Sequence, residues 1–294
     1  MEHAVAMQPS KSEMQRPDAA DRYDTSPARP RPIMILGYCG MIALFVISVI
    51  LLIRIPLPSA NIAAVVVPHH DIVKHQRQEF WRQLLGKIDA KAIKRIIIIG
   101  PDHFGENQRV ISYDNTDWTT SNLTLKNLLS SNSKLPNAFQ KNTGLIKSDH
   151  AIVNLIGEVK QNFPNARFTP FLIGRNVKFK DLGVLSNYLN TACGRYDCLL
   201  ITSVDFSHYL KESVAQAQDK RTVGLLANKT LNQNSLNQHG TIEADSPQSL
   251  YVLQEFARVH GLNYWWLQNQ TNSAFGDPNT TDTTSHVFAG YLKH

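Results

Sequence analysis

The sequence contains few cysteines, only a moderate share of glycine and proline, and a single long apolar run. Three cysteines among 294 residues are too few for a disulfide-rich scaffold. The 15 glycines and 14 prolines exclude a collagen-like or low-complexity chain, and a hydrophobic content of 43% excludes a chain that is disordered throughout. A protein that crosses the membrane several times needs several long apolar runs, so that class is excluded as well.

Several common functional motifs are also missing. The sequence has no G-x-S-x-G nucleophile elbow, no G-x-G-x-x-G dinucleotide-binding fingerprint and no phosphate-binding P-loop. The 30 lysines and arginines exceed the 24 acidic residues and give a net charge of +6, but the basic residues are scattered along the chain. A nucleic-acid surface would need them clustered, so we expect no nucleic-acid partner.

The one long apolar run covers residues 33–53, from Ile33 to Ile53, and contains no charged residue. Its length matches the roughly 20 residues that a helix needs to cross the hydrocarbon core of a membrane. A secretory signal peptide has a shorter apolar core nearer the start of the chain, and a buried core helix rarely runs this far without a polar face. The run therefore predicts one transmembrane helix, with the membrane as an expected partner.

The segments on either side of this run predict how the chain is placed. Residues 1–32 are rich in proline and poor in apolar residues, which is typical of a disordered tail. Arg29 and Arg31 lie just before the run, whereas only Arg54 lies just after it, so the positive-inside rule places the tail in the cytoplasm. We expect a single-pass membrane protein whose residues 54–294 form an extracytoplasmic domain.

Residues 54–294 alternate between short apolar runs and segments with helical spacing. This alternation is typical of an α/β domain whose sheet is buried on both faces. We predict a single three-layer domain with a central, mostly parallel sheet. The predicted strands cover residues 63–67, 95–99, 167–172, 198–202, 262–267 and 286–292, and the predicted helices cover residues 75–88, 149–163, 181–189, 211–228 and 245–260.

Histidines and carboxylates follow three of the predicted strands, at the point where each strand ends. In sheets of this kind ligands bind beyond the carboxyl ends of the strands, so we expect these side chains to form one site. Imidazole and carboxylate are preferred ligands of Fe(II), Zn(II) and Mn(II), so the pattern predicts a metal site. The residues are His69, His70 and Asp71 after the first strand, Asp102 and His103 after the second, and Asp205 and His208 after the strand at 198–202.

Cys193 and Cys198 lie just before and at the start of the strand at 198–202. Their four-residue spacer matches neither the C-x-x-C redox motif nor a zinc knuckle. The pair predicts either a disulfide, if the domain lies outside the cell, or two half-buried thiols.

The residues at the strand ends resemble motifs of the Memo family, in the same order along the chain. Val67-Pro68-His69 resembles the A-P-H of that family, and Ile99-Gly100-Pro101-Asp102-His103 resembles its L-G-P-x-H. Asp149-His150 resembles the start of its E-H-S helix, and residues 203–209 resemble its S-S-D-F-S-H-Y. The family includes the bacterial AmmeMemoRadiSam system protein B and shares its fold with the class III extradiol ring-cleaving dioxygenases.

The resemblance implies a ligand set for the metal. His69 and His103 match two liganding histidines, and the third ligand of the family is usually a cysteine in a T-I-C-G segment. Here that segment reads Thr241-Ile242-Glu243-Ala244, so Glu243 is the expected third ligand, with Asp245 as the alternative if the alignment shifts by two residues. A carboxylate favours a harder ion than a thiolate does, so Fe(II) is the expected cofactor, ahead of Zn(II), Mn(II) or copper. The structural alternative is that Glu243 only stabilises the start of the following helix.

The resemblance also implies roles for other residues. His208 is expected to act as a general acid or base, Asp205 to orient it, and His150 to hydrogen-bond a bound oxygen or anion. These residues suggest a membrane-anchored non-haem iron oxidoreductase of the dioxygenase type, with an unidentified small-molecule substrate. A binding or signalling protein without catalysis and a metal-dependent hydrolase are the alternatives. The resemblance further suggests a functional link to radical-SAM and AMMECR1-like proteins.

Overall fold

The computed structural model describes residues 61–120, 123–129, 135–194, 197–237, 241–271, 274 and 281–293, all of which belong to one compact unit, Pro58–His294. The predicted tail of residues 1–32 and the predicted transmembrane helix of residues 33–53 lie outside the described residues. Within the described ranges, no helix is both long enough and apolar enough to cross a membrane.

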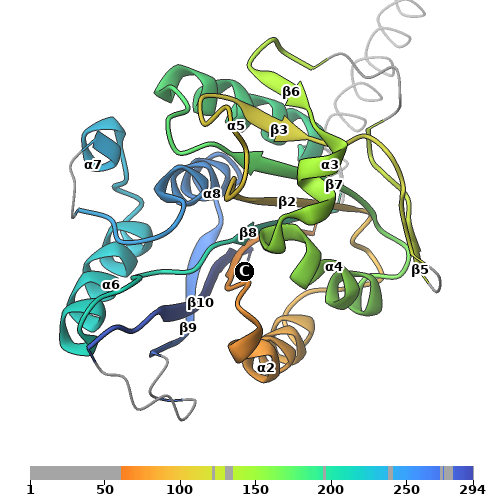
Figure 1. The fold of residues 1–294 in the computed structure, drawn as a ribbon. Coiled ribbons are helices and arrows are strands. Elements are labelled where there is room, and N and C mark those ends of the chain that lie inside the picture. Colours follow the sequence, from red (N-terminus) through yellow and green to blue (C-terminus); the bar gives the residue numbers. More distant parts are fainter. Residues whose placement is uncertain are drawn as a thin grey trace, which may run out of the picture. The chain divides into compact units, whose positions relative to one another are not determined.

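An eight-stranded sheet forms the centre of the described residues (Figure 1), with the strand order β6-β3-β7-β2-β8-β1-β10-β9. Its four central strands β7, β2, β8 and β1 run parallel, whereas β10 is antiparallel to β1, and β9 is antiparallel to β10. This arrangement confirms the predicted α/β class with a mostly parallel central sheet. The strands are β1 (Ile62–Val67), β2 (Arg95–Pro101), β3 (Ile111–Tyr113), β6 (Phe139–Lys141), β7 (Arg167–Ile173), β8 (Cys198–Ser203), β9 (Asn263–Thr271) and β10 (Ser285–Leu292).

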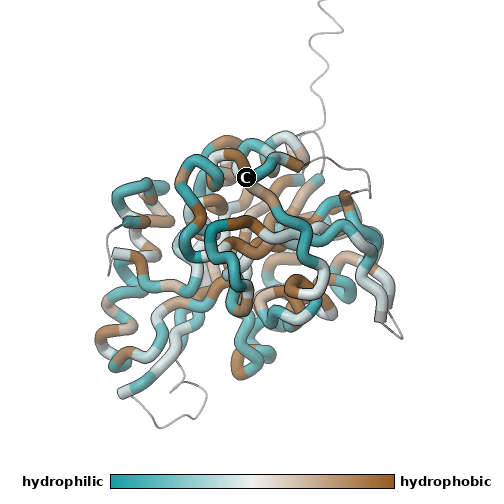
Figure 2. The backbone as a smooth tube through the Cα atoms, turned by 45° about the horizontal axis from the view of Figure 1, so that its top comes forward, coloured by the Kyte–Doolittle hydropathy of each residue, from teal (hydrophilic) through white to brown (hydrophobic). Residues whose placement is uncertain are grey.

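Helices cover both faces of this sheet. Side chains alternate along β1, so that Ala64 and Val66 pack towards α5, α6 and α8, whereas Ala63, Val65 and Val67 pack towards α2, α3 and α4. Figure 2 shows the apolar stretches in the interior strands, and the outer helices alternate between apolar and polar positions. The helices are α2 (Lys74–Leu85), α3 (Thr143–Ser148), α4 (His150–Asn162), α5 (Phe179–Cys193), α6 (Glu212–Ala227), α7 (Gln233–Asn237) and α8 (Pro247–Val259).

The strands and helices predicted within residues 54–294 are all present, with bounds that differ by a few residues. The sequence analysis missed the short elements that lie in polar stretches of the chain. They comprise β3, β6, α3, α7, the 3-10 helix η1 (Asp71–Val73) and the hairpin of β4 (Trp118–Thr120) and β5 (Leu123–Leu125). Three-residue strands carry too few side chains to show a period, which is why the pattern did not predict them.

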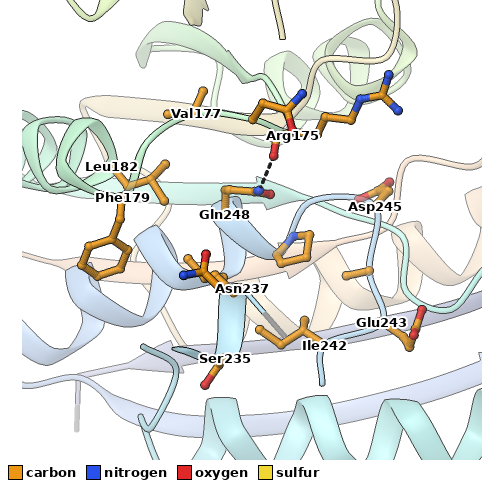
Figure 3. Close-up of a pocket in the computed structure, with 14 residues that line it drawn as sticks. Arg175, Val177, Phe179, Leu182, Ser235, Asn237, Ile242, Glu243, Asp245 and Gln248 are labelled. Atoms are coloured by element: carbon orange, nitrogen blue, oxygen red, sulfur yellow. Dashed lines mark hydrogen bonds between the residues drawn. The ribbon is translucent and has the colours of Figure 1, made fainter. Parts of the chain in front are cut away.

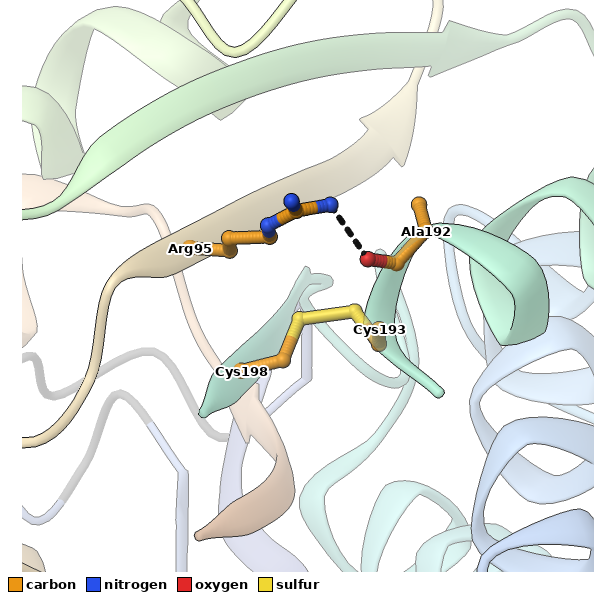
Figure 4. Close-up of a disulfide and its surroundings, with 4 residues drawn as sticks. All are labelled: Arg95, Ala192, Cys193 and Cys198. Carbon is orange, nitrogen blue, oxygen red and sulfur yellow. Dashed lines mark hydrogen bonds between the residues drawn. A yellow bond between two sulfur atoms is a disulfide. The ribbon is translucent and has the colours of Figure 1, made fainter. Parts of the chain in front are cut away.

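Cys193 at the end of α5 and Cys198 at the start of β8 form a disulfide (Figure 4), and both residues are fully buried. The loop that it closes binds the neighbouring strands. The main-chain oxygen of Asp197 accepts hydrogen bonds from the N–H groups of Lys94 and Arg95 at 3.0 and 3.2 Å, and its side chain accepts one from Asn61. Asp197, the residue before Cys198, thus holds together the amino ends of β1, β2 and β8.

We expect thiol titration of the complete chain, unfolded without reductant, to detect one free thiol of the three, because Cys193 and Cys198 are bonded. Reduction should expose all three thiols and lower the free energy of unfolding by roughly 2 kcal/mol, since closing a short loop restricts the unfolded chain. Three free thiols before reduction would contradict the pairing.

Candidate metal centre

The carboxyl ends of β1, β2 and β8 lie side by side. In the parallel register Val67 is opposite Ser203, and Ile99 is opposite Thr202. The loops that follow these strands open into one cavity of about 420 Å³. Histidines and carboxylates dominate its lining, which includes His69, His70, His103, His150, His208, Glu243 and Asp245.

His69 is fully buried at the end of β1, and its ring is held from one side. Its Nδ1 lies 3.2 Å from the hydroxyl oxygen of Ser203, and the side-chain amide of Asn154 donates to its main-chain oxygen at 2.9 Å. On the opposite side of the ring, Nε2 lies 3.2 Å from Asp205 Oδ2 and 3.4 Å from Asp245 Oδ2. The ring is therefore fixed with one nitrogen facing two carboxylates.

His103 is oriented by Asp149, which caps the start of α4. The Asp149 carboxylate accepts hydrogen bonds from the main-chain N–H groups of Ala151 and His103, both at 2.9 Å, and it lies 2.8 Å from His103 Nδ1. A carboxylate at one ring nitrogen orients the ring and leaves the other nitrogen available to a metal ion. That atom, His103 Nε2, lies 4.0 Å from Asp245 Oδ2, and the ring of His150 stacks on His103 at 3.9 Å between centroids.

Asp205 and Asp245 are held against each other by their main chains. The N–H of Asp245 donates to the main-chain oxygen of Asp205 at 3.0 Å, and the N–H of Asp205 donates to Asp245 Oδ2 at 3.2 Å. The loop of Asp205 is also bound to the start of β10, because Phe206 N–H donates to Ser285 and Ser285 N–H donates to Ser207. Asp205 is fully buried, and the side chain of Asp245 is only 12% exposed.

Burial shifts the titratable groups of this cluster towards their neutral forms. It raises the pKa of Asp205 to about 7, and burial together with the charge of Asp205 raises the pKa of Asp245 well above its usual value. Burial and the neighbouring histidines lower the pKa of His69 well below its usual value and that of His70 to about 4. A bound cation would favour the ionised form of the carboxylates, which burial alone disfavours. The histidines need no such change, because a neutral imidazole is the form that binds metal ions.

The cluster fits a metal ion because it leaves buried polar atoms unsatisfied and close together. Among the described residues, His69 Nε2, Asp205 Oδ2 and Asp245 Oδ1 are buried without a hydrogen-bond partner, although buried polar groups almost always have one. The ligand-atom separations of 3.2, 3.4 and 4.0 Å approach the roughly 3.0–3.5 Å between two ligands of one metal. In the part of the chain that the structure describes, three sets offer ligand atoms within 4.8 Å of one another: His69, His103 and His150; His69, Asp205 and Asp245; and His70, Asp205 and His286.

The structure places the two candidates for the third ligand differently. Glu243 lines the cavity, but none of the three sets found among the described residues contains it. Asp245, the alternative that the sequence left open, belongs to one of these sets and faces both His69 and His103. Glu243 also lies before the first turn of α8, because Ser246 caps that helix and accepts a hydrogen bond from Ser249 N–H.

His208 and Tyr209 line the same cavity from the loop after β8. The ring of His208 is 5.7 Å from that of His70, and burial lowers the pKa of His208. Asp205, which was expected to orient His208, lies against His69 and His70 instead, with His70 Nδ1 at 3.4 Å from its Oδ2. Tyr209 is 80% exposed and adopts a φ of 57°, a left-handed conformation that is uncommon outside glycine and often marks a functional loop.

The sequence analysis missed His286, which lies near the start of β10 and is fully buried. Its Nε2 lies 3.1 Å from His70 Nδ1. Because β10 is antiparallel to β1, with Ala289 opposite Val66, the amino end of β10 reaches the carboxyl end of β1. A search restricted to the carboxyl ends of strands therefore does not find this residue.

Arg77 on α2 was also missed, and it fixes the turn that carries His70. Its buried guanidinium donates to the main-chain oxygens of Pro68 and His70 and pairs with Glu158 on α4 at 3.0 Å. The sequence does contain a sign of this role: Arg77 lies three residues before Phe80, on the apolar face of the predicted helix, where a charged residue needs a buried partner.

A second cavity, of about 590 Å³, shares the segment from Glu243 to Asp245 with the first. Figure 3 shows this cavity between Phe179 and that segment, with Gln248 in its wall and donating a hydrogen bond to the main-chain oxygen of Arg175 at 2.8 Å. The same short segment thus forms a wall of both cavities and carries a candidate ligand.

The fold and the site define an α/β domain with groups of histidine and aspartate that could hold a divalent metal ion. The family model described as "Memo-like protein" matches residues 47–246, so the chain belongs to the Memo-like family, and the resemblance of the strand-end motifs is confirmed. No functionally curated protein matches the chain. Among solved structures, the crystal structure of the uncharacterized protein JW3007 from Escherichia coli K12 is similar at 9% identity and a TM-score of 0.44, covering 79% of this chain and 99% of that one.

Replacing Arg77 by methionine should lower the free energy of unfolding by about 3 kcal/mol, because Glu158 would keep a buried charge without its partner. Urea denaturation followed by circular dichroism measures the loss. Adding Glu158→Gln should restore part of it. Arg82→Met is the matched control, since Arg82 pairs with Glu79 on the exposed face of the same helix and should change stability by less than about 0.5 kcal/mol. Equal losses in both arginine variants would contradict the role given to Arg77.

Proposed function

We propose that this domain is a metal-dependent enzyme whose ion is held by His69, His103 and Asp245. The observation that carries the proposal is the convergence of two histidine nitrogens on one carboxylate, since Asp245 Oδ2 lies 3.4 Å from His69 Nε2 and 4.0 Å from His103 Nε2. Ser203 and Asp149 engage the other ring nitrogens, so both rings are oriented before an ion binds.

The ion that we propose is Fe(II), and the reaction is an oxidation of the dioxygenase type. Two histidines and one carboxylate leave coordination positions open, which is the arrangement of the non-haem iron oxygenases. When bound, Fe(II) would supply positions for O₂ and for the oxygen donors of a substrate. Phe104, which is 59% exposed with its ring 5.5 Å from that of His150, and the exposed Tyr209 present aromatic faces near the site. Both support a small aromatic substrate that carries neighbouring hydroxyl groups.

His208 and His150 are the proposed proton carriers. Both line the cavity, and burial lowers the pKa of each, so that both rings are neutral at pH 7 and can accept a proton from a substrate hydroxyl. His150 is held by its stacking on His103, whereas His208 comes from the separate loop after β8. A substrate bound at the ion would therefore have two candidate bases, carried by separate segments of the chain.

We also propose that the domain works outside the cytoplasm and is tethered by residues 33–53. The disulfide between Cys193 and Cys198 supports this placement, because disulfides persist mainly in oxidising compartments. The uncharged run and the arginines that precede it support the same orientation. Thiol titration of protein taken directly from its native membrane tests the placement, since a cytoplasmic domain would contain reduced thiols.

His103→Ala and Asp245→Ala should each weaken metal binding at this site at least 10-fold, and Asp149→Asn should weaken it about 10- to 100-fold through the orientation of His103. Equilibrium dialysis of the complete chain against Fe(II) or Zn(II), with elemental analysis, measures the affinity. Glu243→Ala is the matched control, because this carboxylate lines the same cavity only two residues from Asp245. A loss in Glu243→Ala with no loss in Asp245→Ala would assign the third ligand to Glu243.

The Fe(II)-loaded protein should consume O₂ in the presence of catechols, whereas the Zn(II)-loaded protein should not. His208→Ala should lower kcat about 100-fold or more with unchanged metal content, because it removes a proton carrier and no ligand. An oxygen electrode measures the rate. Zn(II)-dependent hydrolysis of esters without O₂ uptake would identify a hydrolase instead, and tight metal binding with neither reaction would identify a binding protein.

A further inference from the structure

We propose that the cluster holds a second metal ion, bound by His70, His286 and Asp205, and that Asp205 bridges the two ions. The inference deepens the proposed function and rests on it, because the first ion is the one held by His69, His103 and Asp245. The two ions have separate histidine ligands, so each can be removed without removing the other.

The second set of ligand atoms is compact. His70 Nδ1 lies 3.1 Å from His286 Nε2 and 3.4 Å from Asp205 Oδ2, and the three residues offer ligand atoms within 4.8 Å of one another. These separations match the roughly 3.0–3.5 Å between two ligands of one metal ion. Three donors from β10 and from the loops after β1 and β8 therefore meet at one point.

Asp205 Oδ2 belongs to both sets. The same oxygen lies 3.2 Å from His69 Nε2 and 3.4 Å from His70 Nδ1, and it faces histidines on two sides. It is fully buried and has no hydrogen-bond partner among the described residues. Carboxylates in this position commonly bridge pairs of metal ions that lie about 3.5–4 Å apart.

The three ligand atoms converge closely on His70 Nδ1. This nitrogen lies between His286 Nε2 at 3.1 Å and Asp205 Oδ2 at 3.4 Å, and a single N–H on it does not serve both neighbours fully. A cation accepts lone pairs from both nitrogens and from the oxygen at once, and therefore explains why the three atoms converge.

Neighbouring groups hold both histidines in place. The main-chain oxygen of His70 accepts a hydrogen bond from the buried guanidinium of Arg77, and His286 is fully buried in β10, where it pairs with Gln270 of β9. The main chain of each histidine is therefore fixed before an ion binds. The side chain of His70 is 36% exposed, which leaves the second ion accessible from the cavity.

Two ions would also change the charge of the cavity and hence the substrates that it favours. Two divalent ions carry four positive charges, against one negative charge on each of the carboxylates Asp205, Asp245, Glu243 and Asp149, the last of which contacts His103. Two ions side by side would present open positions to anionic oxygen ligands that reach both of them, such as a deprotonated catechol, a carboxylate or a phosphate.

The test is the number of ions bound by the complete chain. Equilibrium dialysis against Zn²⁺, which has no redox chemistry, followed by elemental analysis should give two ions per chain. His70→Ala and His286→Ala should each give one, and His103→Ala should also give one, because it removes the other ion. His70→Ala is the safer variant for folding, since this side chain is partly exposed, and His260→Ala, at the end of α8 and outside both sets, should keep two ions.

Electron paramagnetic resonance of the Mn²⁺-loaded protein provides a second readout. Two ions that share Asp205 should give an exchange-coupled spectrum, and His70→Ala should convert it to that of a single ion. A different outcome is one Zn²⁺ per complete chain, which His103→Ala removes and which His70→Ala and His286→Ala both keep. That result would overturn the second ion and leave the proposed function intact. One ion lost only in His70→Ala and His286→Ala would overturn the proposed first site and with it the bridge.

Discussion

The burial of the Asp205 carboxylate is the constraint on which the rest of the site depends. A carboxylate removed from water must be protonated, hydrogen-bonded or paired with a cation. The main-chain N–H of His69 satisfies Oδ1, whereas Oδ2 faces the rings of His69 and His70. The loops after β1 and β8 and the start of β10 are arranged around this one group, and the pairing of Asp205 with Asp245 brings the segment before α8 to the same point.

The sequence predicted the parts of the fold whose residues are buried on both sides. Runs such as Ile96–Ile99 in β2 and Leu199–Ile201 in β8 are apolar without interruption, and this pattern has few interpretations other than a central strand. Short strands such as β3 and β6 pair at the edge of the sheet, where their formation depends on a neighbour distant in sequence. Nothing local in those three-residue segments indicates the partner.

The sequence predicts those residues of the candidate site that come directly after parallel strands. His69, His103 and Asp205 come directly after such strands, so their convergence follows from the order of the elements. His286 enters from an antiparallel strand, and the choice between Glu243 and Asp245 depends on how the chain bends before α8. Both depend on tertiary geometry that spacing along the chain does not contain. Asp149 shows an intermediate case, because a helix cap is visible in the sequence but its contact with His103 is not.

The disulfide between Cys193 and Cys198 joins the end of α5 to the amino end of β8, whereas most candidate ligands lie beyond the carboxyl ends of β8 and its neighbours. Crowded carboxylates at one edge oppose folding until a cation is present, and the covalent link at the other edge opposes unfolding whether or not a cation is present. The domain therefore has a source of stability that is independent of metal supply. Such a chain retains part of its stability whether or not the candidate ligands hold an ion.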